Sequence, residues 1–150
     1  MTPDRARELL GTVAGVTLSG AGTPVVAQVE PAQWRDAARF AKDTLGCAFF
    51  SFLTAIDWKE QGLEIVAWVD NLDARVSVEL RTKLGPGVTS CASLTPVYRG
   101  ANWMEREGFD MFGVRFEGHP DLRRILLADD WEGHPLLKSY AVDTPHPPYR

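Results

Sequence analysis

The sequence predicts an α+β domain of two layers, in which helices cover one face of a mixed sheet, followed by a helix and an extended C-terminal arm. Early in the chain, stretches with the helical spacing of apolar residues alternate with short stretches typical of strands. Three strand-like stretches then follow one another with only short turns between them. The expected order of elements in the domain is therefore α-β-β-α-β-β-β.

The first half of the domain is predicted to contain two helices and two strands. Residues 3–12 are expected to form the first helix, and residues 16–18 and 24–30 the first two strands. Pro31 then opens a second helix that ends at Gly46, because glycine accepts the left-handed conformation common after a helix. The apolar residues of this helix recur close to i, i+3, i+4 and i+7, so they should face the sheet: Trp34, Ala37, Ala38, Ala41 and Leu45.

The next three strands are expected to form an antiparallel meander. Residues 47–58 are rich in the aromatic and branched side chains of a buried strand. Residues 63–69 and 75–80 alternate in side-chain type and follow the turns at 61–62 and 70–73. Short turns of this kind join neighbouring antiparallel strands.

A third helix is predicted at residues 100–112, after an edge strand at 88–95. Gly113 suits the left-handed residue that follows such a helix. Beyond it the periodicity fades and prolines recur. The chain is therefore expected to divide into an α+β domain, residues 1–116, and an extended, proline-rich arm, residues 117–150.

The composition is that of an ordinary globular domain and argues against a nucleic-acid binder. The chain has 150 residues and a net charge of −4, whereas nucleic-acid binding needs a basic surface. No stretch reaches the roughly 20 apolar residues of a membrane span, and the N-terminal residues do not have the pattern of a secretory leader. Cys47 and Cys91 are expected to be buried free thiols, and two cysteines cannot supply the four ligands of an iron–sulfur cluster.

Glu105 is the unusual residue of the third helix. On a helical projection it lies between two aromatic residues, Phe109 and Phe112, where a carboxylate must be exposed, paired or protonated. One interpretation is a partly buried carboxylate held by Arg123 or Arg124, because a guanidinium suits that role. The other interpretation is a carboxylate that the helix turns into solvent.

The remaining polar residues of this region do not form a catalytic pair. Arg106 and Asp110 are four residues apart and are expected to pair along the helix. Glu105 and Glu107 point roughly 160° apart, so they cannot act on one substrate. His119 shows no metal-ligand spacing and is expected to be a hydrogen-bonded turn residue. The sequence also has no phosphate-binding loop, nucleophile elbow or zinc signature.

The stretch from residue 103 to 140 combines aromatic, charged and turn residues in a specific order. Its residues are Trp103, Glu105, Arg106, Glu107, Asp110, Phe112, Gly113, His119, Pro120, Asp121, Arg123, Arg124, Trp131, Pro135, Leu136, Lys138 and Tyr140. This pattern resembles the signature of the C subunit, the 30 kDa subunit family, of proton-pumping NADH:quinone oxidoreductase, respiratory complex I. The resemblance implies that these residues form a partner interface. The chain departs from the family pattern at Leu137 and Ser139, where arginine and aspartate are usual, so the salt bridges expected there are in question.

The resemblance implies a non-catalytic structural subunit in the peripheral arm of that enzyme, which supports electron transfer from NADH to quinone coupled to proton translocation. It implies no catalytic, cofactor-binding or metal-binding residue in this chain, with FMN and the iron–sulfur clusters held by other subunits. The expected partners are the quinone-site D subunit, around which the arm wraps, and the cluster-bearing B subunit, at the cytoplasmic face of the cell membrane.

Two other functions compete with this one. A homologous subunit occurs in membrane-bound hydrogenases, formate hydrogenlyases and related quinone- or ferredoxin-linked reductases, and the sequence separates these complexes poorly. A free-standing enzyme would need a convergent polar site, which these residues do not supply.

Overall fold

A five-stranded mixed sheet forms the centre of the domain, with its strands in the order β1-β2-β5-β4-β3. The structure, a computed structural model, describes residues 1–143; the last part of the predicted arm, residues 144–150, lies outside the described residues. The strands of this sheet are β1 (Val16–Ser19), β2 (Val25–Val29), β3 (Phe49–Asp57), β4 (Leu63–Asn71) and β5 (Val76–Gly85). A second, two-stranded sheet contains β6 (Ser90–Ala92) and β7 (Arg115–Glu117). The helices are α1 (Pro3–Leu10), α2 (Trp34–Asp43) and α3 (Ala101–Phe112), with short 3-10 turns η1 (Pro31–Gln33) and η2 (Lys59–Gln61).

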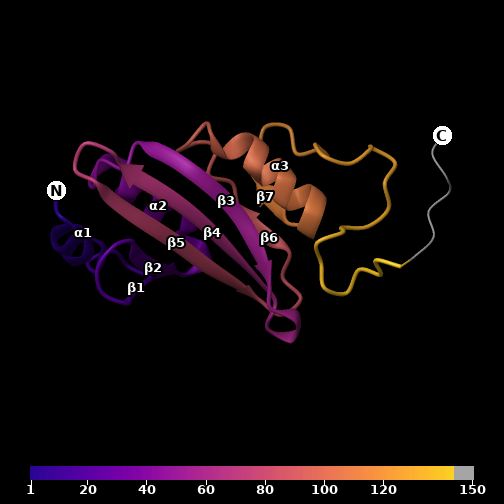
Figure 1. Cartoon of the computed structure of the whole chain (residues 1–150), viewed down its shortest axis with the longest axis horizontal. Coiled ribbons are helices and arrows are strands. Elements are labelled where there is room, and N and C mark those ends of the chain that lie inside the picture. Colours follow the sequence, from indigo (N-terminus) through magenta and orange to yellow (C-terminus); the bar gives the residue numbers. More distant parts are fainter. Residues whose placement is uncertain (144–150) are drawn as a thin grey trace.

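The predicted α+β class and the order of its elements are confirmed (Figure 1). Strands β3, β4 and β5 are antiparallel neighbours, as predicted for the meander, and β1 pairs antiparallel with β2. Strand β2 runs parallel to β5, which makes the sheet mixed. Helix α2 and strands β3 and β4 lie in the connection between β2 and β5, because a tight turn cannot join parallel strands.

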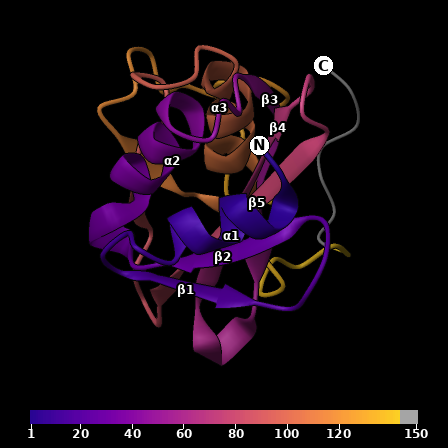
Figure 2. The same ribbon diagram turned by 90° about the vertical axis from the view of Figure 1, so that its left-hand side faces the viewer.

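Helices α1 and α2 lie on the same face of the sheet (Figure 2). Helix α2 begins at Trp34 rather than Pro31, because η1 occupies the first three residues of the predicted helix. Its predicted contact face is fully buried at Trp34, Ala37, Ala38 and Ala41. Alternate residues of β4 are buried beneath the helices: Leu63, Ile65, Ala67 and Val69.

The strand predicted at residues 88–95 is shorter than expected and lies outside the main sheet. Strand β6 has only three residues and pairs in parallel with β7, which the sequence did not predict. The free edge of β3 lies beside α3 instead, where the backbone N–H of Leu53 donates to Sδ of Met104 at 3.2 Å. A strand of three residues has too few alternating positions to reveal its partner in the sequence.

Helix α3 ends at Gly113, whose φ of 75° is the left-handed conformation predicted for it. Residues 118–143 contain no helix or strand and run alongside α3 and past its C-terminal end (Figure 1). This course agrees with an extended arm, and its wrapping around a partner stays a prediction. Cys47 and Cys91 are buried free thiols, as expected. Within residues 1–143, no helix has both the length and the apolar character needed to cross a membrane.

Candidate partner-binding site

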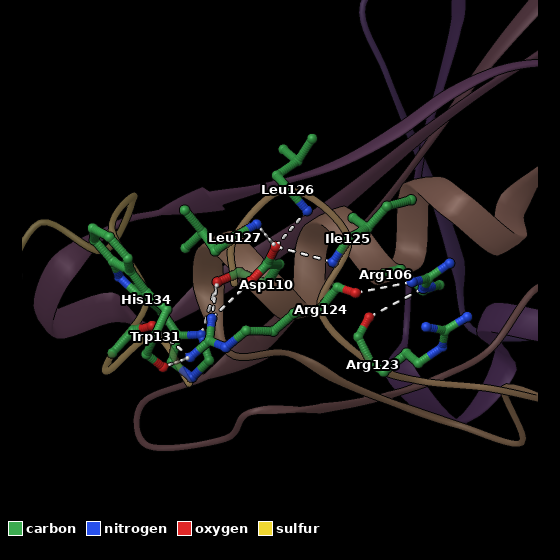
Figure 3. A network of polar contacts seen from close by, with 10 residues as sticks. Arg106, Asp110, Arg123, Arg124, Ile125, Leu126, Leu127, Trp131 and His134 are labelled. Carbon is green, nitrogen blue, oxygen red and sulfur yellow. Dashed lines mark hydrogen bonds and ion pairs between the residues drawn. The ribbon is translucent and has the colours of Figure 1, made fainter. Parts of the chain in front are cut away.

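Asp110 of α3 holds the arm through its carboxylate. Its Oδ2 atom accepts hydrogen bonds from three consecutive backbone N–H groups, those of Ile125 at 3.1 Å, Leu126 at 2.8 Å and Leu127 at 2.9 Å. Its Oδ1 atom accepts from Nη1 of Arg124 at 2.7 Å (Figure 3). Successive amides that converge on one anion form a nest, a backbone site for negative charge. We call Asp110 with residues 124–127 the Asp110 clamp.

The Asp110 clamp keeps a buried carboxylate ionised. Asp110 has no exposed surface. Burial by itself raises the pKa of its carboxyl, but the Arg124 guanidinium and the three arm amides outweigh burial and lower that pKa below its usual value. The charge therefore depends on the arm, and the position of the arm depends on the charge.

Two arginines extend the clamp along the arm. Arg106 of α3 donates from Nε to the carbonyl oxygen of Arg123 at 3.1 Å and from Nη2 to that of Arg124 at 2.8 Å. Arg124 donates from Nη2 to the carbonyl oxygens of Trp131 and Gly133 (Figure 3). The predicted pairing of Arg106 with Asp110 is wrong, because the guanidinium of Arg106 reaches past its own helix to the arm carbonyls.

Glu105 is fully buried, but neither Arg123 nor Arg124 pairs with it. Its Oε2 accepts from the hydroxyl of Ser93 and its Oε1 from the backbone N–H of Leu94, both at 2.6 Å. The predicted partners Arg123 and Arg124 are wrong, because Glu105 projects toward the loop after β6, whereas the arm lies along the side of α3 that carries Asp110. Burial raises the pKa of Glu105 to about 7, although the bonds from Ser93 and Leu94 oppose this rise.

Two Gly-His-Pro turns attach the arm to α3 through their histidines. His119 accepts at Nδ1 from the backbone N–H of Asp121, so its Nε2 carries the proton donated to the carbonyl oxygen of Asn102 at 2.9 Å. It is the hydrogen-bonded turn residue that the sequence predicted. His134 donates from Nδ1 to the carbonyl oxygen of Asp110, also at 2.9 Å. Sequence reasoning missed this role of His134, which the repeated Gly-His-Pro motif could have suggested.

Gly113 is required where the second turn meets the end of α3. Besides its left-handed φ, a Cβ atom at Gly113 would lie 2.8 Å from Cδ2 of His134. The ring of His134 also packs edge-on against Phe109. The helix therefore needs a residue without a side chain at this point, for both its conformation and its contact.

The last described part of the arm returns to the sheet domain. The backbone N–H of Leu136 donates to the carbonyl oxygen of Met111 at 3.0 Å, and that of Lys138 donates to Oδ2 of Asp57 at 2.8 Å. Asp57 is a second contact that sequence reasoning missed, because it lies at the end of β3. Leu137, one of the two departures from the expected pattern, packs half-buried against the hydrophobic core.

The structure divides the predicted interface residues into an internal and an exposed group. Trp103 is 71% exposed on α3, and the side chains of Asp121 and Arg123 form only an exposed ion pair with each other. The internal group, which is buried or partly buried, consists of Glu105, Arg106, Asp110, Phe112, Gly113, His119, Arg124, Trp131, Pro135 and Tyr140. The exposed group consists of Trp103, Glu107, Pro120, Asp121, Arg123, Leu136 and Lys138.

Sequence comparison relates this chain to respiratory enzymes. The family described as "Respiratory-chain NADH dehydrogenase, 30 Kd subunit" matches residues 27–146. The C subunit of NADH-quinone oxidoreductase from Chlorobium phaeobacteroides is 39% identical over 145 residues, which cover 93% of this chain and 86% of the relative. The C/D subunit of NADH-quinone oxidoreductase from Phocaeicola vulgatus is 39% identical over 93 residues, which cover 61% of this chain and 18% of that protein.

Solved structures share the fold at lower identity. A trypsin-resistant fragment (1–134) of Nqo5 has a TM-score of 0.69 and 21% identity, and the match covers 81% of this chain and 100% of the fragment. A chain of the membrane-bound sulfane sulfur reductase, an archaeal respiratory membrane complex, has a TM-score of 0.77 and 22% identity, with 93% of this chain and 85% of that chain covered. At these identities the likeness concerns the fold alone.

Proposed function

Because the chain belongs to the family of the 30 kDa subunit of respiratory-chain NADH dehydrogenase, we propose that it is a non-catalytic, structural subunit of the peripheral arm of NADH:quinone oxidoreductase. Its role is to join the subunits that carry out electron transfer from NADH to quinone coupled to proton translocation. The reaction itself takes place on groups held by other chains.

One observation carries this proposal: residues 125–127 of the arm are attached by their backbone amides, and several apolar side chains of the arm remain exposed. The three amides bound to Asp110 belong to Ile125, Leu126 and Leu127. The side chain of Leu126 points away from Asp110 and is 61% exposed (Figure 3). Exposed apolar side chains on an arm without secondary structure are typical of a protein interface. Holding them in place before binding reduces the entropy lost on association.

We propose the quinone-site D subunit and the cluster-bearing B subunit as the partners, at the cytoplasmic face of the cell membrane. The name of the relative from Phocaeicola vulgatus joins C and D, and this chain matches only 18% of that protein. When two subunits form one polypeptide in a relative, they are expected to lie side by side where they are separate chains.

We also propose that FMN and the iron–sulfur clusters belong to the other subunits. Burial raises the pKa of Cys47 to about 11 and that of Cys91 to about 12. Both cysteines also lie in the hydrophobic core, which supports a role for each as a packing residue.

A second candidate is the equivalent subunit of another respiratory membrane complex. The likeness in fold to a chain of the sulfane sulfur reductase supports it. The 39% identity to a C subunit of NADH-quinone oxidoreductase, over nearly the whole chain, favours the first candidate.

Affinity purification from native membranes tests the proposal. The tagged chain should be recovered with subunits that contain flavin and iron–sulfur clusters, whereas the chain purified alone should show no visible absorbance. Recovery of the flavin subunit that accepts electrons from NADH would favour the first candidate over the second. Recovery of the chain without any cluster-bearing partner would reject both.

A further inference from the structure

The face of the sheet opposite α1 and α2 carries a pair of stacked aromatic rings. Figure 1 looks onto this face, with α2 behind β4 and β5. Phe52 of β3 and Trp68 of β4 are directly opposite each other in the register, and their ring centroids lie 6.0 Å apart at an interplanar angle of 28°. Their strand neighbours Leu53 and Ala67 are buried in the core, so Phe52 and Trp68 project to the other side. Phe52 is 40% exposed.

A carboxylate lies beside these rings. Asp70 follows Trp68 by two residues on the same face, and its partner in the register is Phe49, which is 51% exposed. Asp70 accepts from Nε1 of Trp68 at 3.0 Å, from the hydroxyl of Ser77 at 2.6 Å and from the hydroxyl of Ser51. A carboxylate offers about four acceptor positions. Three neutral donors therefore leave one position, on Oδ2, available to a further donor.

Asp70 differs from the other carboxylates on this face because no basic side chain in residues 1–143 pairs with it. Glu64 and Glu79 lie on the same face, and Arg81 is 3.7 Å from the first and 2.5 Å from the second. Among residues 1–143, no lysine or arginine forms an ion pair with Asp70. Burial raises the pKa of Asp70, but its three hydrogen bonds outweigh burial and lower that pKa, so the group is charged at neutral pH. The surface thus holds a preformed negative charge beside the aromatic side chains of Phe49, Phe52 and Trp68.

We propose that this surface, made of Phe49, Phe52, Trp68 and Asp70, binds an arginine side chain of a partner subunit. A guanidinium stacks on aromatic rings through its planar face and can donate to the remaining acceptor position of Asp70. Lysine has no planar face for the rings and fits less well. The class of partner rests on the proposed function; the recognition chemistry rests on these residues alone.

Photo-crosslinking in the assembled complex tests where the surface lies. Phe52 is replaced by p-benzoylphenylalanine, and the same residue is placed at Arg39, which is exposed on α2, as a control. The Phe52 position should crosslink to another subunit on a peptide that contains arginine, and the Arg39 position should not. A chain that still purifies with the complex but gives no crosslink from position 52 overturns this inference and leaves the proposed function intact. A chain recovered without any partner overturns the proposed function.

Two matched substitutions test the chemistry. Asp70→Asn removes the charge and keeps a side chain that accepts hydrogen bonds, whereas Asp73→Asn removes the same charge from the nearby exposed turn. In membrane complexes washed with salt, Asp70→Asn should release the subunit about tenfold faster than wild type, and Asp73→Asn should release it at the wild-type rate. Phe52→Leu, which keeps an apolar side chain without the ring, should also speed release. Equal rates for all three variants and wild type, with normal unfolding of each isolated chain, would contradict the proposal.

Discussion

Arg124 reaches from the arm to α3 and forms an ion pair of 2.7 Å between its Nη1 atom and Oδ1 of Asp110. The carboxylate is fully buried and the guanidinium side chain is 13% exposed, so either charge left alone there would carry a large desolvation penalty. The same guanidinium also binds two carbonyl oxygens further along the arm. A single side chain therefore connects two stretches of the arm to the helix.

Arg124→Ala should release the arm while the sheet domain stays folded. Loss of one partner of a buried pair costs about 3–5 kcal/mol. Here this cost destabilises the docking of the arm onto α3. Limited proteolysis should show much faster cleavage within residues 118–143, and the complex should fail to assemble. Arg123→Ala is the control, because its side chain makes only an exposed ion pair with Asp121. Equal protection of the arm in both variants would show that the Asp110 clamp does not hold it.

Glu105 should make stability fall as the pH rises through the weakly acidic range. Its pKa is about 7 in the folded chain against a usual value of 4.5, so the folded state binds this proton more tightly than the unfolded state. Stability is therefore lost between about pH 4.5 and pH 7, by roughly 3 kcal/mol from this residue, and no further loss follows above that window.

Urea unfolding of wild type and Glu105→Gln at several pH values measures this effect. The amide has no charge to desolvate and can still accept from Leu94. The variant should lack the loss of stability between pH 4.5 and 7, so the difference between the two proteins should widen across that window. Parallel pH profiles would mean that Glu105 does not titrate there.

Gly113→Ala should weaken the arm as well as the helix end. A residue with a side chain pays about 1 kcal/mol for a left-handed φ, and the added methyl group would also displace His134. Gly20→Ala provides the matched control, because Gly20 has a φ of 68° and no atom within 4 Å of the added Cβ. Both variants should lose stability in urea unfolding, but only Gly113→Ala should expose the arm to protease. If the arm of Gly113→Ala is as well protected from protease as that of Gly20→Ala, Gly113 does not help to hold the arm.

Leu126→Asp should block assembly without unfolding the chain. The side chain is mostly exposed, so a carboxylate there stays in water in the isolated protein but must be buried at an apolar interface. Co-purification from membranes should be lost, while the circular dichroism and melting temperature of the isolated variant stay near wild type. Leu72→Asp, in the exposed turn between β4 and β5, should assemble normally. If Leu126→Asp assembles normally, this part of the arm does not belong to the interface.

The sequence predicted those parts of the fold that depend on periodic side chains. The buried face of α2, the β3–β4–β5 meander and the left-handed Gly113 all follow from residue spacing or conformational preference. The partners of Asp110 could not be predicted in this way, because most of them are backbone amides, and every residue except proline has one.

The same reason explains the wrong partner predicted for Glu105. The pattern left open whether this carboxylate is buried or exposed, and the structure buries it. Its partners are a serine hydroxyl and a backbone amide, where the buried interpretation expected an arginine. A charged partner can be recognised by its residue type, whereas a loop that offers its backbone can be recognised only when its path is known.

The two histidine contacts determine where residues can be inserted into this protein. Asn102 and Asp110 are eight residues apart on α3 (110 − 102), which is about 12 Å along the axis. The histidines that bind their carbonyls are fifteen residues apart (134 − 119) in an irregular chain, which could extend over about 50 Å. One residue inserted between Asn102 and Asp110 would rotate the second attachment point by about 100°. An insertion at 128–130 would only enlarge a loop that already has slack. The arm can therefore gain residues at 128–130, between the Asp110 clamp and the second turn, whereas α3 must keep its number of residues between Asn102 and Asp110.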